Sequence, residues 1–132
     1  MDWVKIGGHA YDVIVTELER SFNILYSENT GRTIAPGAPV TLDPLGTFYG
    51  HKVTFKRKEG YESEFDRLWD YLSMPRNSGI PVEIVYNQTT INYNAYVSSG
   101  SQKLKRIDPK TGKVYWDVLS ANFIPVEAQV KP

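Results

Sequence analysis

Apolar and polar residues alternate along most of the chain, which is the period-two pattern of half-buried β-strands. Gly7-Gly8 and the run 108–112 (DPKTG) are typical of tight turns, because glycine tolerates positive φ and proline fixes an early turn position. A further hairpin turn is predicted at 87–90. Such short connections favour antiparallel pairing of successive strands. The predicted strands are residues 3–6, 9–18, 21–26, 46–57, 81–86, 91–99, 103–107 and 113–123.

One segment instead repeats its apolar residues with the helical period. The stripe consists of Tyr61, Phe65, Leu68, Trp69 and Leu72. This spacing predicts an amphipathic helix at residues 61–73, with its apolar stripe docked on one face of the sheet. Glu62 and Glu64 favour the positive end of the helix dipole, and Pro75 ends the segment because proline cannot continue the hydrogen-bond ladder.

Residues 27–45 separate two predicted strands and contain several residues that interrupt regular structure. These are Asn29, Gly31, Pro36, Gly37, Pro39 and Pro44. The segment therefore predicts one long loop. Structureless loops beyond about 12 to 15 residues are uncommon in compact domains and are usually functional or disordered. Residues 27–45 are interpreted either as a contact arm or as an unstructured surface loop.

The last predicted strand has apolar residues in both phases of the alternation. Trp116 and Val118 are out of register with Leu119, Ala121 and Phe123. This pattern indicates either a β-bulge or a strand that is covered on both faces. In the second case the strand would be central in the fold or would lie at an interface.

Taken in order, the chain predicts three strands, a long loop, one strand, a helix and four strands. This order is typical of an α+β fold that is mainly antiparallel β, a sandwich or open barrel with one amphipathic helix packed on its side. At 132 residues, 41% hydrophobic and 23% charged, the chain is expected to form a single domain at 1–132 around one core.

Charge and cysteine content narrow the range of functions. Fifteen Lys and Arg balance fifteen Asp and Glu, so no overall positive field concentrates nucleic acid or an anionic membrane. The chain has no cysteine, and therefore no disulfide, thiolate nucleophile or cysteine metal site. It has no secretory segment and no apolar run approaching about 18 residues. These features predict a soluble domain made inside a cell, without a membrane partner.

The sequence offers little material for catalysis. His9 and His51 lack the flanking histidines or carboxylates of a metal or general-base motif. Glu62, Asp66 and Asp70 share one helical face, but on an amphipathic helix such a row is typically a solvated surface. No phosphate-binding loop or nucleophile elbow is present. We expect no catalytic residue, no metal and no cofactor.

Basic residues gather in two places. They are Lys52, Lys56, Arg57 and Lys58, and then Lys103, Lys105, Arg106, Lys110 and Lys113. With Tyr96 and Tyr115 they allow a second interpretation, a β-barrel that binds single-stranded nucleic acid or another ligand through phosphate contacts and stacking. Edge strands also use lysine to block unwanted pairing. Because the net charge is zero, edge protection or charge complementarity between subunits is favoured, and no specific nucleic acid is expected.

Several local strings, together with the order of elements, resemble the small tail proteins of bacteriophages and prophages of Gram-positive bacteria. The strings are residues 21–25 (SFNIL), 28–32 (ENTGR), 46–49 (GTFY), 64–69 (EFDRLW) and 96–100 (YVSSG). None of these strings carries catalytic chemistry. The proline-rich stretch 35–44 departs from the family pattern, which leaves the docking of the arm open.

The resemblance implies a β-sandwich or barrel with a flanking helix, similar to tail-tube, distal-tail or baseplate-hub domains that form rings around a channel. It implies a homo-oligomer, with a hexameric ring as the expectation, and other phage tail proteins as partners. The protein would be made in the bacterial host cytoplasm and located in the virion tail. No active site accompanies such a family, so the predicted function is structural.

In such an assembly, long loops and outer strands reach the neighbouring subunits. Tyrosine suits interfaces because it buries a large area while keeping a polar tip. The candidate subunit contacts are Glu28, Arg32, Tyr49, Tyr96, Lys103, Lys105 and Tyr115.

Overall fold

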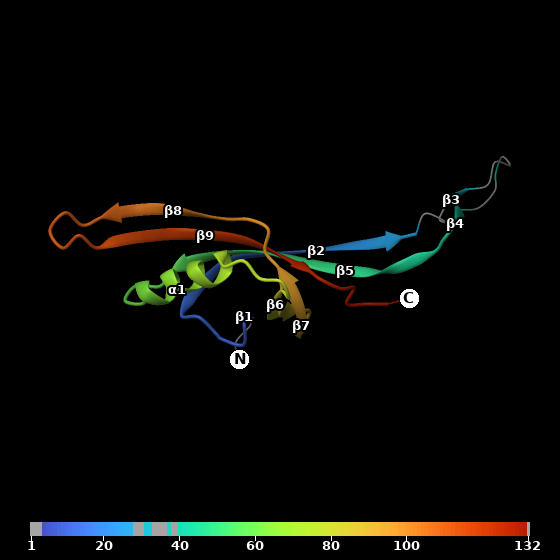
Figure 1. The fold of residues 1–132 in the computed structure, drawn as a ribbon, viewed down its shortest axis with the longest axis horizontal. Coiled ribbons are helices and arrows are strands. Elements are labelled where there is room, and N and C mark those ends of the chain that lie inside the picture. Colours follow the sequence, from blue (N-terminus) through green and yellow to red (C-terminus); the bar gives the residue numbers. More distant parts are fainter. Residues whose placement is uncertain (1–3, 28–30, 33–36, 38–39, 132) are drawn as a thin grey trace.

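The computed structural model describes residues 4–27, 31–32, 37 and 40–131. Within them, a curled antiparallel sheet is drawn out into two ribbons that point in opposite directions, and one helix packs against its middle (Figure 1). The elements are β1 (Val4–Ile6), β2 (Val13–Tyr26), β3 (Gly31–Arg32), β4 (Val40–Thr41), β5 (Pro44–Arg57), α1 (Glu62–Ser73), β6 (Ile80–Tyr86), β7 (Thr89–Tyr96), β8 (Gly100–Ile107) and β9 (Val114–Pro125).

The main sheet has the strand order β1-β6-β7-β9-β5-β2, and β8 pairs with β9 off this path. Every pairing among the described strands is antiparallel. β9 is central, since it pairs with β5, β8 and β7, and its ladder with β8 shifts register between Gln102 and Arg106. The sheet curls into a half barrel, which confirms the predicted α+β open barrel. The last predicted strand corresponds to β9. Its central place and its bulged pairing with β8 explain why it has apolar residues in both phases of the alternation.

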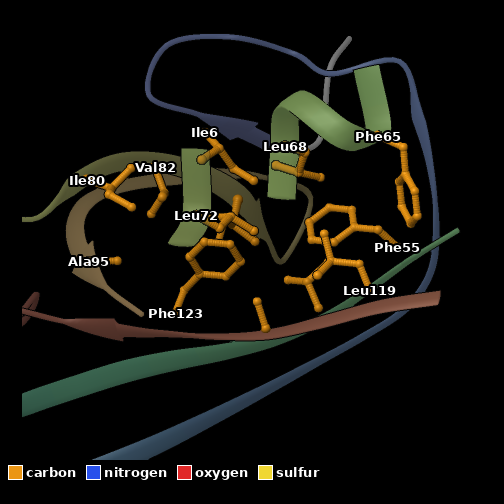
Figure 2. Close-up of a cluster of buried hydrophobic side chains, with 13 residues drawn as sticks. Ile6, Phe55, Phe65, Leu68, Leu72, Ile80, Val82, Ala95, Leu119 and Phe123 are labelled. Carbon is orange, nitrogen blue, oxygen red and sulfur yellow. The ribbon is translucent and has the colours of Figure 1, made fainter. Parts of the chain in front are cut away.

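The core lies between the helix and the inner face of the sheet (Figure 2). Phe65, Leu68 and Leu72 of α1 are buried against Phe55 and Phe123 of the sheet. The apolar stripe of the sequence is therefore the docked face of the helix, and burial of such side chains stabilises the fold by about 1.5 to 3 kcal/mol each. The helix begins at Glu62, one residue later than predicted, because Tyr61 occupies the N-cap position.

The start of the chain differs from the prediction. After the turn at Gly7-Gly8 only an isolated bridge joins Ile6 to His9, and β1 pairs instead with β6. This pairing places Ile6 beside Val82 within the buried core. The two strands predicted at 9–18 and 21–26 are one strand, β2, because both halves pair with β5 in an almost continuous register. The polar residues between them do not end the strand, since β2 lies at the sheet edge and remains exposed to solvent.

In the described part of residues 27–45, which the sequence predicts as one long loop, short extended pieces are present. β5 already starts at Pro44, which lies opposite Tyr26, and the short strands β3 and β4 pair with each other further out. Proline is tolerated at the first residue of a strand because its missing N–H removes no interior ladder bond. Pro44 and Leu45 therefore belong to the β2–β5 ribbon, and β3 and β4 form a separate two-stranded sheet. Asn29, Pro36 and Pro39 lie outside the described residues.

Gly7 and Gly8 provide a matched test of the turn after β1. Both have positive φ, but a Cβ at Gly7 would lie 2.2 Å from the Tyr71 hydroxyl, whereas one at Gly8 meets nothing within 4 Å. Gly8→Ala is expected to cost about 1 to 2 kcal/mol from backbone strain alone. Gly7→Ala is expected to cost about 2 to 5 kcal/mol, because Tyr71 must also move. Urea unfolding of both variants checks this order, and equal losses would contradict the close packing of Tyr71.

Candidate assembly surfaces

The β2–β5 ribbon extends beyond the core (Figure 1). Its outer half exposes apolar side chains. Phe22 is 69% exposed, and Ile24, Leu25 and Leu45 are also exposed. Phe22 and Ile24 lie on one face and Leu25 on the other, because successive side chains of a strand alternate. A two-stranded ribbon has no core of its own and is marginally stable alone. Exposed apolar side chains on such a ribbon are typical of a surface that binds another protein.

The C-terminal segment anchors the inner strand of this ribbon. The Thr47 backbone N–H donates to the Val130 carbonyl at 2.8 Å. The side-chain amide of Gln129 accepts from the Tyr49 backbone N–H at 3.0 Å and donates to the Tyr49 carbonyl at 2.9 Å. Gln129 thus satisfies both backbone groups of Tyr49, as a neighbouring strand would. The C-terminal segment therefore lies along the free side of β5, where β9 no longer pairs with that strand.

Four strands, in the order β2-β5-β9-β8, form a sheet whose two outer strands each pair on one side only within the described residues. The β2 edge carries Glu17 and Glu19, and the β8 edge carries Lys103 and Lys105. All four side chains are exposed. Unpaired strand edges are templates for pairing with another chain. Here the two edges carry opposite charge.

Two neighbouring cross-strand rows are polar on the face of this sheet that lies opposite the helix. Register places Glu17, Thr54, Ser120 and Ser101 in one cross-strand row. A second row holds Glu19, Lys52 and Asn122. Thr54 and Ser120 approach within 3.4 Å through their hydroxyl groups. This face is therefore suited to contact with water rather than to burial in a core.

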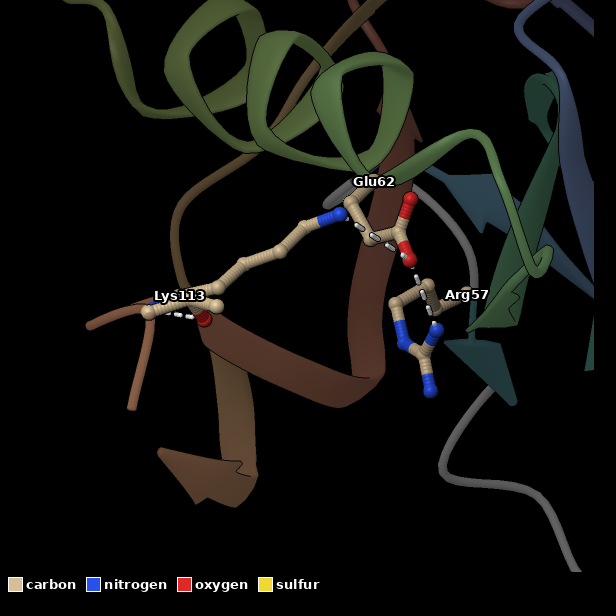
Figure 3. Close-up of polar contacts among 4 residues, drawn as sticks. Arg57, Glu62 and Lys113 are labelled. Atoms are coloured by element: carbon tan, nitrogen blue, oxygen red, sulfur yellow. Dashed lines mark hydrogen bonds and ion pairs between the residues drawn. The ribbon is translucent and has the colours of Figure 1, made fainter. Parts of the chain in front are cut away.

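Tyr115 on β9 is surrounded by cations of the same chain. The guanidinium of Arg106 lies 4.3 Å from the ring centroid, that of Arg57 lies 5.0 Å away and the Lys113 ammonium 5.4 Å away. Glu62 at the start of α1 pairs with Arg57 at 3.3 Å and with Lys113 at 3.8 Å (Figure 3). These contacts fix the start of the helix to the β8–β9 hairpin.

The carboxyl group of Glu62 is held in its ionised form. Its pKa is lowered chiefly by the hydrogen bond from its own backbone N–H, with further contributions from Lys113, the Gly60 backbone and Arg57. Such lowering is expected at a helix start, where free N–H groups and the helix dipole favour negative charge. Burial raises the pKa of Asp66 on the same helix, and the neighbouring Asp70 and Glu62 add to that rise.

The seven predicted contact residues are not brought into one patch. Lys103 and Lys105 are exposed on the β8 edge, and Tyr96 is 48% exposed near the end of β7. Tyr49 packs its ring against Tyr86 at 5.5 Å, and Tyr115 lies among its own cations. Arg32 is in β3, with no description of its side chain, and Glu28 lies outside the described residues.

Sequence reasoning missed Phe22, Ile24 and Leu25 as surface candidates. A signal was present, since Phe22 and Ile24 occupy one phase of the strand and Leu25 the other. A strand with apolar residues in both phases needs cover on both faces. Among the residues that the structure describes, no such cover lies over Ser21 through Tyr26, all of which are exposed.

The described residues contain no group of three or more His, Asp or Glu that could hold a metal ion. His9 forms a surface pair with Glu64 at 3.5 Å, while His51 is buried against Tyr93.

A cavity of about 510 Å³ between α1, β1 and β2 is lined mainly by apolar side chains, including Val13, Leu18 and Leu68. Within the part of the chain that the structure describes, no helix has the length and apolarity needed to cross a membrane.

Comparison with known proteins gave a likeness to a solved structure. No protein-family model matches the chain, and no curated protein sequence matches it. Among solved structures, the Dit protein of phage SPP1, titled a paradigm of the hub adsorption apparatus in phages that infect Gram-positive hosts, is similar with a TM-score of 0.47 and 15% identity. The match covers 94% of this chain and 49% of that one, so the chain spans about half the length of the phage protein.

Proposed function

We propose that the chain is a structural component of a bacteriophage tail or baseplate, which assembles with copies of itself and docks with neighbouring tail proteins. The observation that carries the proposal is the β2–β5 ribbon, which extends from the core and exposes Phe22, Ile24 and Leu25. Such a ribbon gains stability when another subunit covers it. The resemblance of the sequence strings to small phage tail proteins gives this assembly its biological setting.

The opposite charges of the two free edges support head-to-tail association. In the order β2-β5-β9-β8, the antiparallel pairings make β2 and β8 run in opposite directions. A β8 strand from the next copy can therefore continue the antiparallel ladder beside β2, with Lys103 and Lys105 near Glu17 and Glu19. Head-to-tail contacts of this kind produce a ring when the rotation closes.

The polar face of the four-stranded sheet supports a place beside water in that ring. Thr54, Ser120 and Asn122 are uncharged hydrogen-bonding residues, and Glu19 lies opposite Lys52 on the same face. A continuous sheet with this face directed inward would line a water-filled channel. The helix and the apolar core would then lie on the outside of the ring.

Charge reversal on the β8 edge tests the proposal. Lys103→Glu with Lys105→Glu is expected to weaken self-association about tenfold or more, because two attractive contacts with Glu17 and Glu19 become repulsive. Lys110→Glu, in the turn of the same hairpin, is the matched control and should have a small effect. Sedimentation velocity over a concentration series measures the change.

The reverse exchange on the β2 edge makes this test specific. Glu17→Lys with Glu19→Lys should also weaken self-association. A mixture of the two double variants should then recover the assembly, since one variant has two acidic edges and the other has two basic edges, so both edges of each are complementary to the other protein. Unchanged association of both variants would refute pairing between these edges.

The alternative of a single-strand nucleic-acid module receives less support. Stacking of bases requires a free aromatic face next to cations. Tyr115 has Arg57, Arg106 and Lys113 of its own chain around its ring, and Glu62 neutralises part of their charge.

A further inference from the structure

A cluster of polar and aromatic side chains joins the base of the β2–β5 ribbon to the β6–β7 hairpin. We call it the aromatic junction, and it consists of Arg20, Tyr49, His51, Tyr86 and Tyr93. His51 is central to it. Its Nδ1 lies 2.7 Å from the Tyr93 hydroxyl, and the two rings stack with centroids 5.6 Å apart. The apolar contacts of the core thus give way here to contacts of His51, whose strength depends on the protonation of its imidazole.

Two further contacts complete the aromatic junction. The guanidinium of Arg20 on β2 donates to the Asn87 side-chain oxygen at 2.9 Å and lies 5.7 Å from the Tyr86 ring centroid. The Tyr49 ring meets the same Tyr86 ring edge-on at 5.5 Å. Each of these contacts links the ribbon to the hairpin. No ladder of backbone hydrogen bonds joins β2 or β5 directly to β6 or β7 among the described strands, so their direct contacts here are between side chains, while β9 links the two parts by pairing with both β5 and β7.

His51 has little room for a positive charge. Its side chain is only 2% exposed, and its Nε2 is buried with no hydrogen-bond partner among the described residues. A protonated imidazole donates from both nitrogens. The Tyr93 hydroxyl can accept from Nδ1, but Nε2–H would face no acceptor. Leaving such a buried donor unpaired is unfavourable.

The charged groups around His51 add to this effect. Arg20 lies directly opposite on β2, and the residue opposite on β9 is the apolar Phe123. Burial lowers the pKa of His51 first, and the Arg20 charge lowers it further. No carboxylate of the described residues contributes to this shift in pKa. Tyr93 faces His51 from β7 and stays a neutral phenol, because burial raises its pKa well above the usual range.

We propose that the aromatic junction is a pH-sensitive hinge, which holds the ribbon against the β6–β7 hairpin while His51 is neutral and opens when His51 takes up a proton. The hinge is a property of the single chain and does not depend on the proposed tail function. In a tail component it would let acidity change the direction of the assembly ribbon relative to the body.

The sign of the pH dependence follows from proton linkage. An opened junction exposes His51, which then titrates near its ordinary value of 6.5. The closed form binds that proton less readily, so lowering the pH favours the open form. Opening is therefore expected to rise about tenfold for each pH unit below about 6.5, until the lowered pKa of the closed form is reached. Above about pH 7 no dependence on His51 remains.

Amide hydrogen exchange at pH 5 to 7.5, corrected for the intrinsic rate, tests the hinge. Exchange in β6, β7 and the base of the ribbon should increase as the pH falls, while the amide of Leu119 in the central strand β9 stays protected. His51→Gln should abolish this pH dependence, because glutamine does not titrate. His9→Gln is the matched control and should retain it, since the chain has two histidines and His9 is the exposed one.

A proton NMR titration of the two imidazoles keeps the test decisive if the His51 variant does not fold. In the unmodified protein His51 should titrate below 6.5, with exchange between closed and open forms. A His51 that titrates at or above 6.5 would overturn the proposal. So would equal loss of protection at Leu119, because the whole domain would then unfold in acid without any hinge.

Discussion

Aspartate at both Phe22 and Ile24 is expected to abolish self-association while the chain stays folded. Both side chains are exposed on the ribbon, so the substitution removes no core contact. In an assembled ring the same positions would be covered, and burying two unpaired carboxylates there is strongly unfavourable. Each interface anchor that is lost costs about 2 kcal/mol or more, so losing both should lower the association constant by a factor of about 1,000 or more. Light scattering and thermal unfolding of the same sample measure the two effects.

The matched control places the same charge on the other face of the ribbon. Ser21→Asp with Asn23→Asp alters the same strand at neighbouring exposed positions without removing an apolar side chain. This variant should lose less association than the Phe22 and Ile24 variant. If both pairs have the same effect, charge alone is responsible and the apolar contact is refuted.

The largest loss of stability is expected for Phe55→Ala. Phe55 is 1% exposed and lies between the helix and the sheet (Figure 2). Truncating a buried phenylalanine removes its transfer free energy and leaves a cavity, at a cost of about 3 to 5 kcal/mol. Domains of this size are stable by about 5 to 15 kcal/mol, so a substantial share of the stability would be lost. Chemical denaturation measures the change.

Phe22→Ala is the counterpart of this variant for stability. The same truncation at a side chain that is 69% exposed should change the free energy of unfolding by no more than about 0.5 kcal/mol. A loss of several kcal/mol at Phe22 would mean that the ribbon folds back onto the body in solution. That result would contradict the extended ribbon.

The helix and the inner face of β5 could be predicted because their patterns reflect local periodicity. Phe65, Leu68 and Leu72 share one stripe, and Val53 and Phe55 share one strand face, so each set had to be buried on one side. The sequence cannot say as readily which strand pairs with which. β1 pairs with β6 across more than 70 residues of chain, a choice determined by tertiary packing rather than by the turn at Gly7-Gly8.

The assembly surface could be predicted only in part. Lys103 and Lys105 could be proposed from the sequence because lysine is common on outer strands, and the structure places both exposed on β8. Phe22 and Ile24 were missed because alternation predicts a half-buried strand whether the covering layer comes from the same chain or from another. Tyr49 is predicted from the sequence as a subunit contact, but its ring packs on Tyr86 of the same chain. The sequence does not reveal this contact because the two residues are far apart along the chain.

Electron microscopy of the purified, unmodified protein over a concentration series tests the central claim most directly, with solution mass measured on the same fractions. The proposed function predicts closed rings with a hollow centre, or tubes built from them, and a mass that is a fixed multiple of the chain mass. A strict monomer at every concentration would contradict self-assembly through the ribbon and the β2 and β8 edges.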